Sequence, residues 1–202
     1  MRTTAASAII LLLGIWAAWA ITGGFKAITA EQARRLDISR KQPAVPVVRL
    51  IDQSGRAFRF GEWVRNENKL LIVDFIYTNC QTICRSLGTE FQQLQRDIAE
   101  RGLQDRVHLL SVSFDPAHDS PAVLKEYAEH MQAMPDVWTF ATVGDARELD
   151  ALLRTFGVIV IPDRQGGYQH NAALIRVAPS GRLVSVADFD SSESLLNELA
   201  GS

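Results

Sequence analysis

The stretch Leu70-Leu-Ile-Val-Asp-Phe-Ile-Tyr-Thr-Asn-Cys-Gln-Thr-Ile-Cys-Arg-Ser-Leu-Gly88 decides the fold of this chain. Its apolar, β-branched first part, residues 70–77, predicts a buried strand. Asn79 is a typical helix N-cap, and apolar residues recur after it at helical spacing, so we expect a helix from about Cys80 to Gly102. The stretch therefore predicts a strand–turn–helix unit with two cysteines at its turn.

Cys80 and Cys84 are the only cysteines in the chain. Residues four apart on a helix share a face, with Cβ atoms about 6 Å apart, so two thiols there can chelate one soft metal ion. They can also form a disulfide if the turn distorts. The unpaired N–H groups and the dipole at a helix start stabilise a thiolate and lower its pKa. The alternative is that both cysteines are small buried apolar side chains.

The composition indicates one globular domain with an N-terminal appendage. The chain has 202 residues, 47% hydrophobic content and a net charge of −2. It has no basic run and a sequence pI near 6.1, which argues against nucleic-acid binding. Two cysteines are too few for a disulfide scaffold.

The appendage, residues 1–25, is expected to be a membrane anchor. No charged residue lies between Arg2 and Lys26, and a helix of about 20 apolar residues spans a bilayer. Trp16 and Trp19 suit an interfacial belt. An alternative is a signal peptide, because Ala18-Trp-Ala20 has the small-x-small form of a cleavage site. A short N-terminal tail ahead of an anchor usually stays in the cytoplasm, so we expect a single-pass protein of the inner (plasma) membrane with its soluble domain in the periplasm.

Residues 26–42 are a polar linker, with helical character near Glu31, and residues 43–202 form the domain. Its pattern alternates strands and helices, which predicts an α/β fold with a central mixed sheet and helices on both faces. The cysteine turn follows a central strand, at the edge where open α/β sheets place their ligand sites. The other expected elements are strands 47–51, 57–60, 107–114, 138–143, 172–177 and 182–186, and helices starting at 121, 145 and 191.

Four segments carry a resemblance to a known family: Cys80-x-x-x-Cys84, Val112-Ser-Phe-Asp-Pro116, Gly167-Tyr-Gln-His170 and Leu174-Ile-Arg-Val-Ala-Pro-Ser-Gly-Arg-Leu183. The layout resembles a thioredoxin-like three-layer sandwich, and the motifs resemble those of the Sco/SenC family of copper chaperones. The resemblance covers roughly residues 43–200, and the family's membrane anchor matches the N-terminus in type.

The resemblance implies one copper ion, as Cu(I) or Cu(II), bound by Cys80, Cys84 and His170, and a role in assembling the copper-A centre of cytochrome c oxidase. Two thiolates and an imidazole suit a soft ion such as Cu(I), although zinc also accepts such a site. Asp115 matches the family's acidic residue after the third strand and would act in the second shell, or it is simply a turn former. Asp74 is similar to the buried proton-accepting aspartate of thioredoxin.

Two functions follow from these residues, and they are not exclusive. The first is a metallochaperone that delivers copper by ligand exchange, without turnover, to the copper-A subunit of cytochrome c oxidase or to another copper or thiol protein. The second is an enzyme, a membrane-tethered thiol–disulfide oxidoreductase in which Cys80 attacks and Cys84 resolves. Reductases of the thioredoxin type resemble one another in a cis-proline before the strand that faces the cysteines. Here that place holds Gln169-His170-Asn171, which favours the metal. A third alternative is an interaction domain with a static disulfide.

The remaining histidines fit structural positions better than ligand positions. His108 lies within a predicted buried strand, so we expect a core residue. His118 lies in the turn after Pro116 and is expected to face solvent. His130 falls late in a predicted helix, where a cation suits the dipole.

Overall fold

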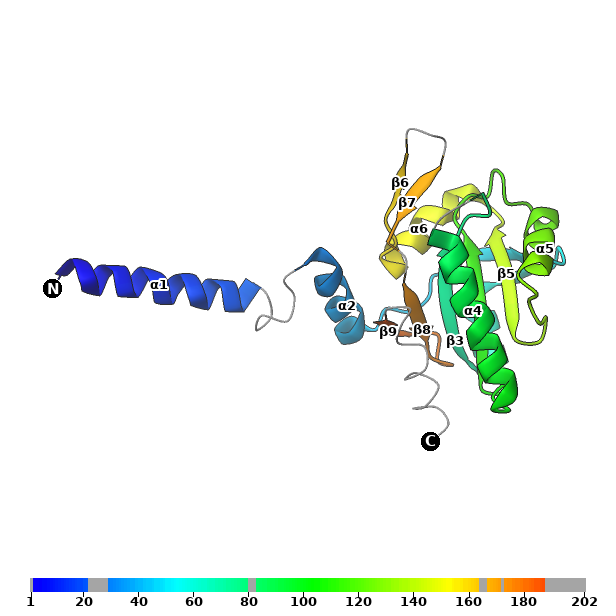
Figure 1. Cartoon of the computed structure of the whole chain (residues 1–202), viewed down its shortest axis with the longest axis horizontal. Helices are drawn as coiled ribbons and strands as arrows, with labels where there is room; N and C mark the ends of the chain where they lie inside the picture. The colour runs from blue at the N-terminus through cyan, green and yellow to red at the C-terminus, as the bar shows by residue number, and fades with distance from the viewer. Residues whose placement is uncertain (1, 22–28, 80–82, 164–166, 172, 188–202) are drawn as a thin grey trace. The chain divides into compact units, whose positions relative to one another are not determined.

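The computed structural model describes residues 2–21, 29–79, 83–163, 167–171 and 173–187 (Figure 1). The chain divides into two compact units, residues 1–41 and 42–202. The predicted final helix, which starts at residue 191, lies outside the described residues.

The first unit contains two helices, α1 (Arg2–Ile21) and α2 (Ala30–Lys41). Within the described segments, no helix has both the length and the apolar character needed to cross a membrane. A capping box opens α2, because Thr29 Oγ1 accepts from the Gln32 amide and Gln32 Oε1 accepts from the Thr29 amide, each at 3.2 Å. The helical character expected near Glu31 is thus confirmed and extends through Lys41.

A seven-stranded mixed sheet forms the centre of the second unit, in the order β2-β1-β5-β4-β3-β8-β9. Strands β3, β4 and β5 are parallel, and the antiparallel strands β1 and β8 flank them. The strands are β1 (Arg49–Asp52), β2 (Ala57–Arg59), β3 (Leu70–Ile76), β4 (Val107–Ser113), β5 (Trp138–Val143), β8 (Leu174–Val177) and β9 (Leu183–Ala187). The helices are α3 (Phe60–Glu67), α4 (Ile83–Glu100), α5 (Pro121–His130) and α6 (Ala146–Phe156).

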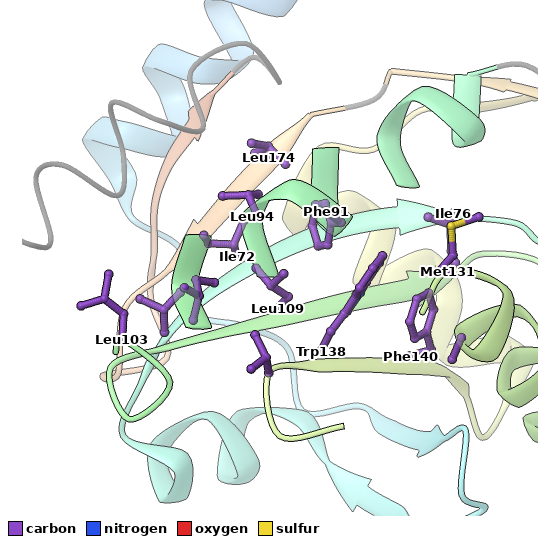
Figure 2. Close-up of a cluster of buried hydrophobic side chains, with 14 of the residues drawn as sticks. Ile72, Ile76, Phe91, Leu94, Leu103, Leu109, Met131, Trp138, Phe140 and Leu174 are labelled. Atoms are coloured by element: carbon purple, nitrogen blue, oxygen red, sulfur yellow. The ribbon is translucent and has the colours of Figure 1, made fainter. Parts of the chain in front are cut away.

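The main core lies between the sheet and helices α4 and α5 (Figure 2). Trp138 of β5 is its largest member, with its ring centroid 5.3 Å from that of Phe91 on α4. Ile72 and Ile76 of β3 face this side, because alternate residues of a strand point to the same face. Other members of this core are Leu94, Ile98, Leu103, Val107, Leu109, Leu124, Phe140 and Leu174.

Helices α3 and α6 cover the opposite face through an aromatic cluster. Phe156 of α6 lies 5.9 Å from Phe60 of α3 and 5.1 Å from Phe75 of β3, between ring centroids. Phe75 lies one residue before Ile76 and therefore points to the other face of β3. The two cores confirm the mixed sheet with helices on both faces.

Two elements differ from the sequence-based expectation. Helix α3 follows β2 directly, where we expected only a strand, and its N-cap Arg59 makes no side-chain capping bond. An eight-residue helix without a capping residue gives little sequence signal. The segment before His170, where no strand or helix was expected, forms a two-stranded hairpin of β6 (Val160–Pro162) and β7 (Tyr168–His170).

The start of α4 lies unusually close to the loop after α5. A Cβ atom added to Gly88 would lie 2.7 Å from Sδ of Met131, which is too close for any side chain to fit without movement. Met131 is buried in the main core. Gly88 therefore allows the first turns of α4, which carry Cys84, to approach the core closely.

Asp74 is a buried carboxylate in the middle of β3, with 2% of its surface exposed. Ser111, its register partner on β4, hydrogen-bonds to it, and Ser111 Oγ accepts from Trp138 Nε1 at 2.9 Å. Asp74 Oδ1 has no hydrogen-bond partner among the described residues. Burial outweighs the hydrogen bonds and raises the pKa of Asp74 to about 7.

This pKa predicts that stability falls as the pH rises. The unfolded chain releases the Asp74 proton near pH 4, but the folded chain keeps it until about pH 7. Between these values the unfolded state binds fewer protons, so raising the pH favours unfolding, by up to about 4 kcal/mol. We expect Asp74→Asn to remove this decline in urea unfolding at pH 4.5 to 8. The matched control is Asp105→Asn on an exposed loop, which should keep the decline; an equal decline in Asp74→Asn would contradict the assignment.

Candidate metal centre

The cysteine turn begins at the carboxyl end of β3, the last strand of the parallel group, which lies between the parallel β4 and the antiparallel β8. Tyr77, Thr78 and Asn79 follow the strand, and α4 is described from Ile83 onward; the helix start expected near Cys80 lies outside the described residues. Cys84 lies in the first turn of α4. Cys80 and the side chain of Cys84 lie outside the described residues, so their predicted role as metal ligands stays a prediction.

The carboxylate of Asp119 fixes the residues just before the turn. Its Oδ2 accepts from the Thr78 amide at 3.0 Å, and its Oδ1 accepts from the Thr78 hydroxyl at 2.5 Å. Ser113 Oγ, at the end of β4, also donates to Oδ2 at 2.5 Å. Asp119 is fully buried, so these bonds are shielded from water. The entry to the cysteine turn is therefore bonded to the end of β4 and to the loop before α5.

His170 reaches this end of the sheet on the β6–β7 hairpin, which stands apart from the seven-stranded sheet (Figure 1). Val160 pairs with His170, and Pro162 pairs with Tyr168. Tyr168 and His170 are two residues apart and share one face of the hairpin. Both rings contact Phe114 at the end of β4, with centroids 5.6 and 5.0 Å from it.

Asn171 fixes the chain directly after His170. Its Oδ1 accepts from the Ile159 amide at 2.6 Å, and its Nδ2 donates to the Gly157 carbonyl at 3.0 Å. Gly157 ends α6 with a φ of 64°, which favours glycine. The hairpin that carries His170 is thus bonded to the end of α6.

His170 is half-buried, and both nitrogens of its imidazole are buried. Neither Nδ1 nor Nε2 has a partner among the described residues. Burial lowers the pKa of His170, so the ring is neutral near pH 7 and has a lone pair for a metal. Buried polar groups in proteins are almost always satisfied, so two orphaned nitrogens point to a group that is not part of the described chain. His170 therefore fits the role of a metal ligand.

Asp115 and His118 form a pair on the loop after β4. His118 Nδ1 lies 2.8 Å from Asp115 Oδ2, and the carboxylate raises the pKa of His118. The His118 side chain is 75% exposed, which confirms a solvent-facing turn residue. Asp115 is buried and accepts from His118. The predicted role of Asp115 in orienting a metal ligand stays a prediction.

The other two histidines lie away from the site. His108 is buried on β4, its Nε2 is 2.9 Å from Thr139 Oγ1, and burial lowers its pKa to about 4. This confirms His108 as a core residue. His130 is exposed at the last position of α5.

Among the described side chains, no group of three or more His, Cys, Asp or Glu residues could hold a metal ion. The role of Asp119 and the contact between Phe114 and His170 were not predicted, because both link residues far apart in the chain. The sequence signal for Asp119 is that it is a second aspartate in the turn between a predicted strand and the helix predicted from Pro121.

Comparison with known proteins places this geometry in a family. The SCO1/SenC family model matches residues 38–200. The SCO1 protein homolog of Bacillus subtilis strain 168 is 29% identical over 120 residues, which are 58% of this chain and 61% of that protein. The chain thus spans less than two thirds of that relative's length.

Solved structures share the fold. Arabidopsis thaliana ScoI with copper bound is similar at a TM-score of 0.66 and 20% identity, over 79% of this chain and 100% of that one. BsSco, a member of the Sco family of cytochrome c oxidase assembly proteins with a disulfide switch, is similar at a TM-score of 0.66 and 22% identity, over 78% of this chain and 92% of that one. With a family match that extends over most of its length, this chain belongs to the SCO1/SenC family.

Proposed function

We propose that this chain binds one copper ion through Cys80, Cys84 and His170 and delivers it to the copper-A centre of cytochrome c oxidase. One observation carries the proposal: His170 is held at the end of the sheet with both ring nitrogens buried and unpartnered in the described structure. Family membership supports the assignment, because Arabidopsis ScoI binds copper and BsSco belongs to a family of oxidase assembly proteins.

The donor set matches the chemistry that delivery requires. Two thiolates and a neutral imidazole form a soft site that suits Cu(I), and hard ions such as magnesium would find no oxygen ligands in it. The lowered pKa of His170 keeps its ring neutral, so a proton does not compete with the metal near pH 7. Copper is the cargo here, and a partner's ligands would replace these three one at a time.

The proposal includes attachment to the inner membrane, with the domain in the periplasm. It rests on the sequence, which has no charge between Arg2 and Lys26. The large apolar side chains of α1 also favour it, because Ile10 is 70% exposed and Leu11 and Leu12 are each 65% exposed. Contiguous apolar surface of this kind is a common sign of membrane or protein contact.

A second candidate function is thiol–disulfide exchange, and Asp74 is the observation that favours it. Asp74 lies on β3, six residues before Cys80, and its pKa is about 7. A carboxyl group with this pKa can accept and return a proton near neutral pH. In this reaction the Cys80 thiolate attacks a partner's disulfide, and Cys84 then displaces the partner as a dithiol, leaving Cys80 and Cys84 oxidised.

Substitution of each ligand tests the copper proposal. We expect the reduced full chain to bind about one copper ion, and Cys80→Ser, Cys84→Ser and His170→Ala each to weaken binding more than about 100-fold. Loss of a second-shell group alone typically costs 10- to 100-fold in metal affinity, and loss of one of three ligands costs more. The measurement is an anaerobic copper titration against a chromophoric chelator, with metal analysis.

The matched control is His130→Ala, which removes an exposed histidine from α5 and should leave the affinity unchanged. Wild-type affinity in the His170→Ala chain, with both thiols reduced, would reject the three-ligand site. That result would favour thiol–disulfide exchange instead.

Oxidation provides a separate prediction. A disulfide between Cys80 and Cys84 would remove both thiolate ligands at once, so the oxidised chain should lose copper binding and regain it after reduction. The measurement is the same titration on oxidised chain, with a free-thiol assay to verify its state. Equal copper affinity in the two states would show that the thiols are not ligands.

Membrane attachment can be tested by cell fractionation. We expect the full chain to remain in the membrane pellet after alkaline carbonate extraction, and a chain lacking residues 3–25 to become soluble, since the deletion removes the apolar segment. External protease added to spheroplasts should degrade the domain. Release of the full chain by carbonate would contradict the anchor, and protection from protease would contradict the periplasmic location.

A further inference from the structure

We propose that the hydroxyl group of Tyr77 is a positioning group for the metal site. It joins the strand that leads to Cys80 to the hairpin that carries His170. This inference rests on the proposed copper site, and it adds a residue that acts through His170 rather than on the metal itself.

The contact consists of two hydrogen bonds to the backbone of one residue. Tyr77 Oη donates to the Tyr168 carbonyl at 3.3 Å and accepts from the Tyr168 amide at 3.2 Å. Tyr77 comes directly after β3 and three residues before Cys80, and Tyr168 lies on β7 two residues before His170. The two bonds therefore connect segments 91 residues apart, each next to a proposed ligand.

The hairpin ladder leaves these backbone groups available to Tyr77. The Asp163 amide donates to the Gly167 carbonyl at 2.8 Å, across the β6–β7 pair. Pairs in an antiparallel ladder alternate between hydrogen-bonded and non-hydrogen-bonded. Asp163 and Gly167 are a hydrogen-bonded pair, so the next pair, Pro162 and Tyr168, is not hydrogen-bonded across the ladder. The amide and carbonyl of Tyr168 then point away from β6. Tyr77 Oη satisfies both of them.

Ring packing at the same place makes the contact tight. The Tyr77 ring lies 5.2 Å from the Tyr168 ring and 5.3 Å from the Phe114 ring, between centroids. Phe114 in turn contacts His170. A Cβ atom added to Gly167 would lie 3.1 Å from Tyr77 Oη, so the hairpin approaches the hydroxyl as closely as a glycine allows.

This arrangement preorganises the third ligand. Strand β7 is not part of the seven-stranded sheet, so no ladder joins it to β3. Without the Tyr77 hydroxyl, the rings would still pack and Asn171 would still hold one end of the hairpin, but Tyr168 would lose its two bonds to the segment that leads to Cys80. Binding copper would then require His170 to be ordered, and the entropy lost in ordering it would weaken the affinity.

The variant Tyr77→Phe tests the inference, because it keeps the ring and removes only the hydroxyl. We expect the full chain in detergent to bind copper about 10-fold more weakly, the effect of losing two hydrogen bonds. In the His170→Ala background, Tyr77→Phe should have no further effect, because the hydroxyl acts through His170. The Cu(II) complex should also show a weakened or heterogeneous imidazole nitrogen coupling by electron paramagnetic resonance.

The matched control is Tyr168→Phe, which removes a hydroxyl from the neighbouring ring but keeps the backbone groups that Tyr77 contacts. It should bind copper like the wild type. A second readout needs no metal: amide hydrogen exchange at Tyr168 in the apo chain should be faster in Tyr77→Phe and unchanged in Tyr168→Phe.

The outcomes separate this inference from the proposed function. If the wild type binds no copper, or if His170→Ala binds like the wild type, the proposed site fails. If the site holds but Tyr77→Phe keeps wild-type affinity and wild-type Tyr168 exchange, the positioning role fails. An equal loss of affinity with and without His170 would also overturn it, because the hydroxyl would then be a general structural group.

Discussion

The burial of β3 on both faces is the constraint on which the rest of the structure depends. The strand has β4 on one side and β8 on the other, and helices cover it from both faces. Ile72 and Ile76 pack toward α4, and Phe75 packs toward α6. A strand held in this way cannot slip by one residue, because a slip would exchange its two faces. Its carboxyl end is therefore a fixed point from which the cysteine turn departs.

Hydrogen bonds also hold the residues that follow the carboxyl end of β3. Asp119 is buried and accepts three hydrogen bonds, two from Thr78 and one from Ser113. Removing this carboxylate would leave the buried Ser113 hydroxyl and two half-buried Thr78 donors unsatisfied, which is more costly than losing the bonds alone. The chain beside the proposed ligands therefore has two kinds of support. Thr78, just before the cysteine turn, is held by a core strand and a buried carboxylate, while His170 is held by contact with the Phe114 ring and by the Asn171 bonds to the end of α6.

Much of this could be predicted from the sequence because its determinants are local. The apolar run of β3, the periodicity of α4 and the strand at Trp138–Val143 each carry their own pattern. The β6–β7 hairpin could not be predicted, since each of its strands has three residues and one contains Pro162. The bonds from Thr78 to Asp119 and from Tyr77 to Tyr168 join residues 41 and 91 positions apart. No pattern within a short window specifies such pairs, because the sheet brings them together.

The small size of the β6–β7 hairpin has a kinetic consequence. A two-stranded hairpin is marginally stable by itself, and this one belongs to a sheet of its own. Segments of this kind open locally with a free energy well below that of global unfolding. The residence time of any group held by His170 would then be governed by the opening rate of the hairpin. Changes in the main core that alter global stability would leave that rate almost unaffected, so release and unfolding would be independently adjustable properties of one domain.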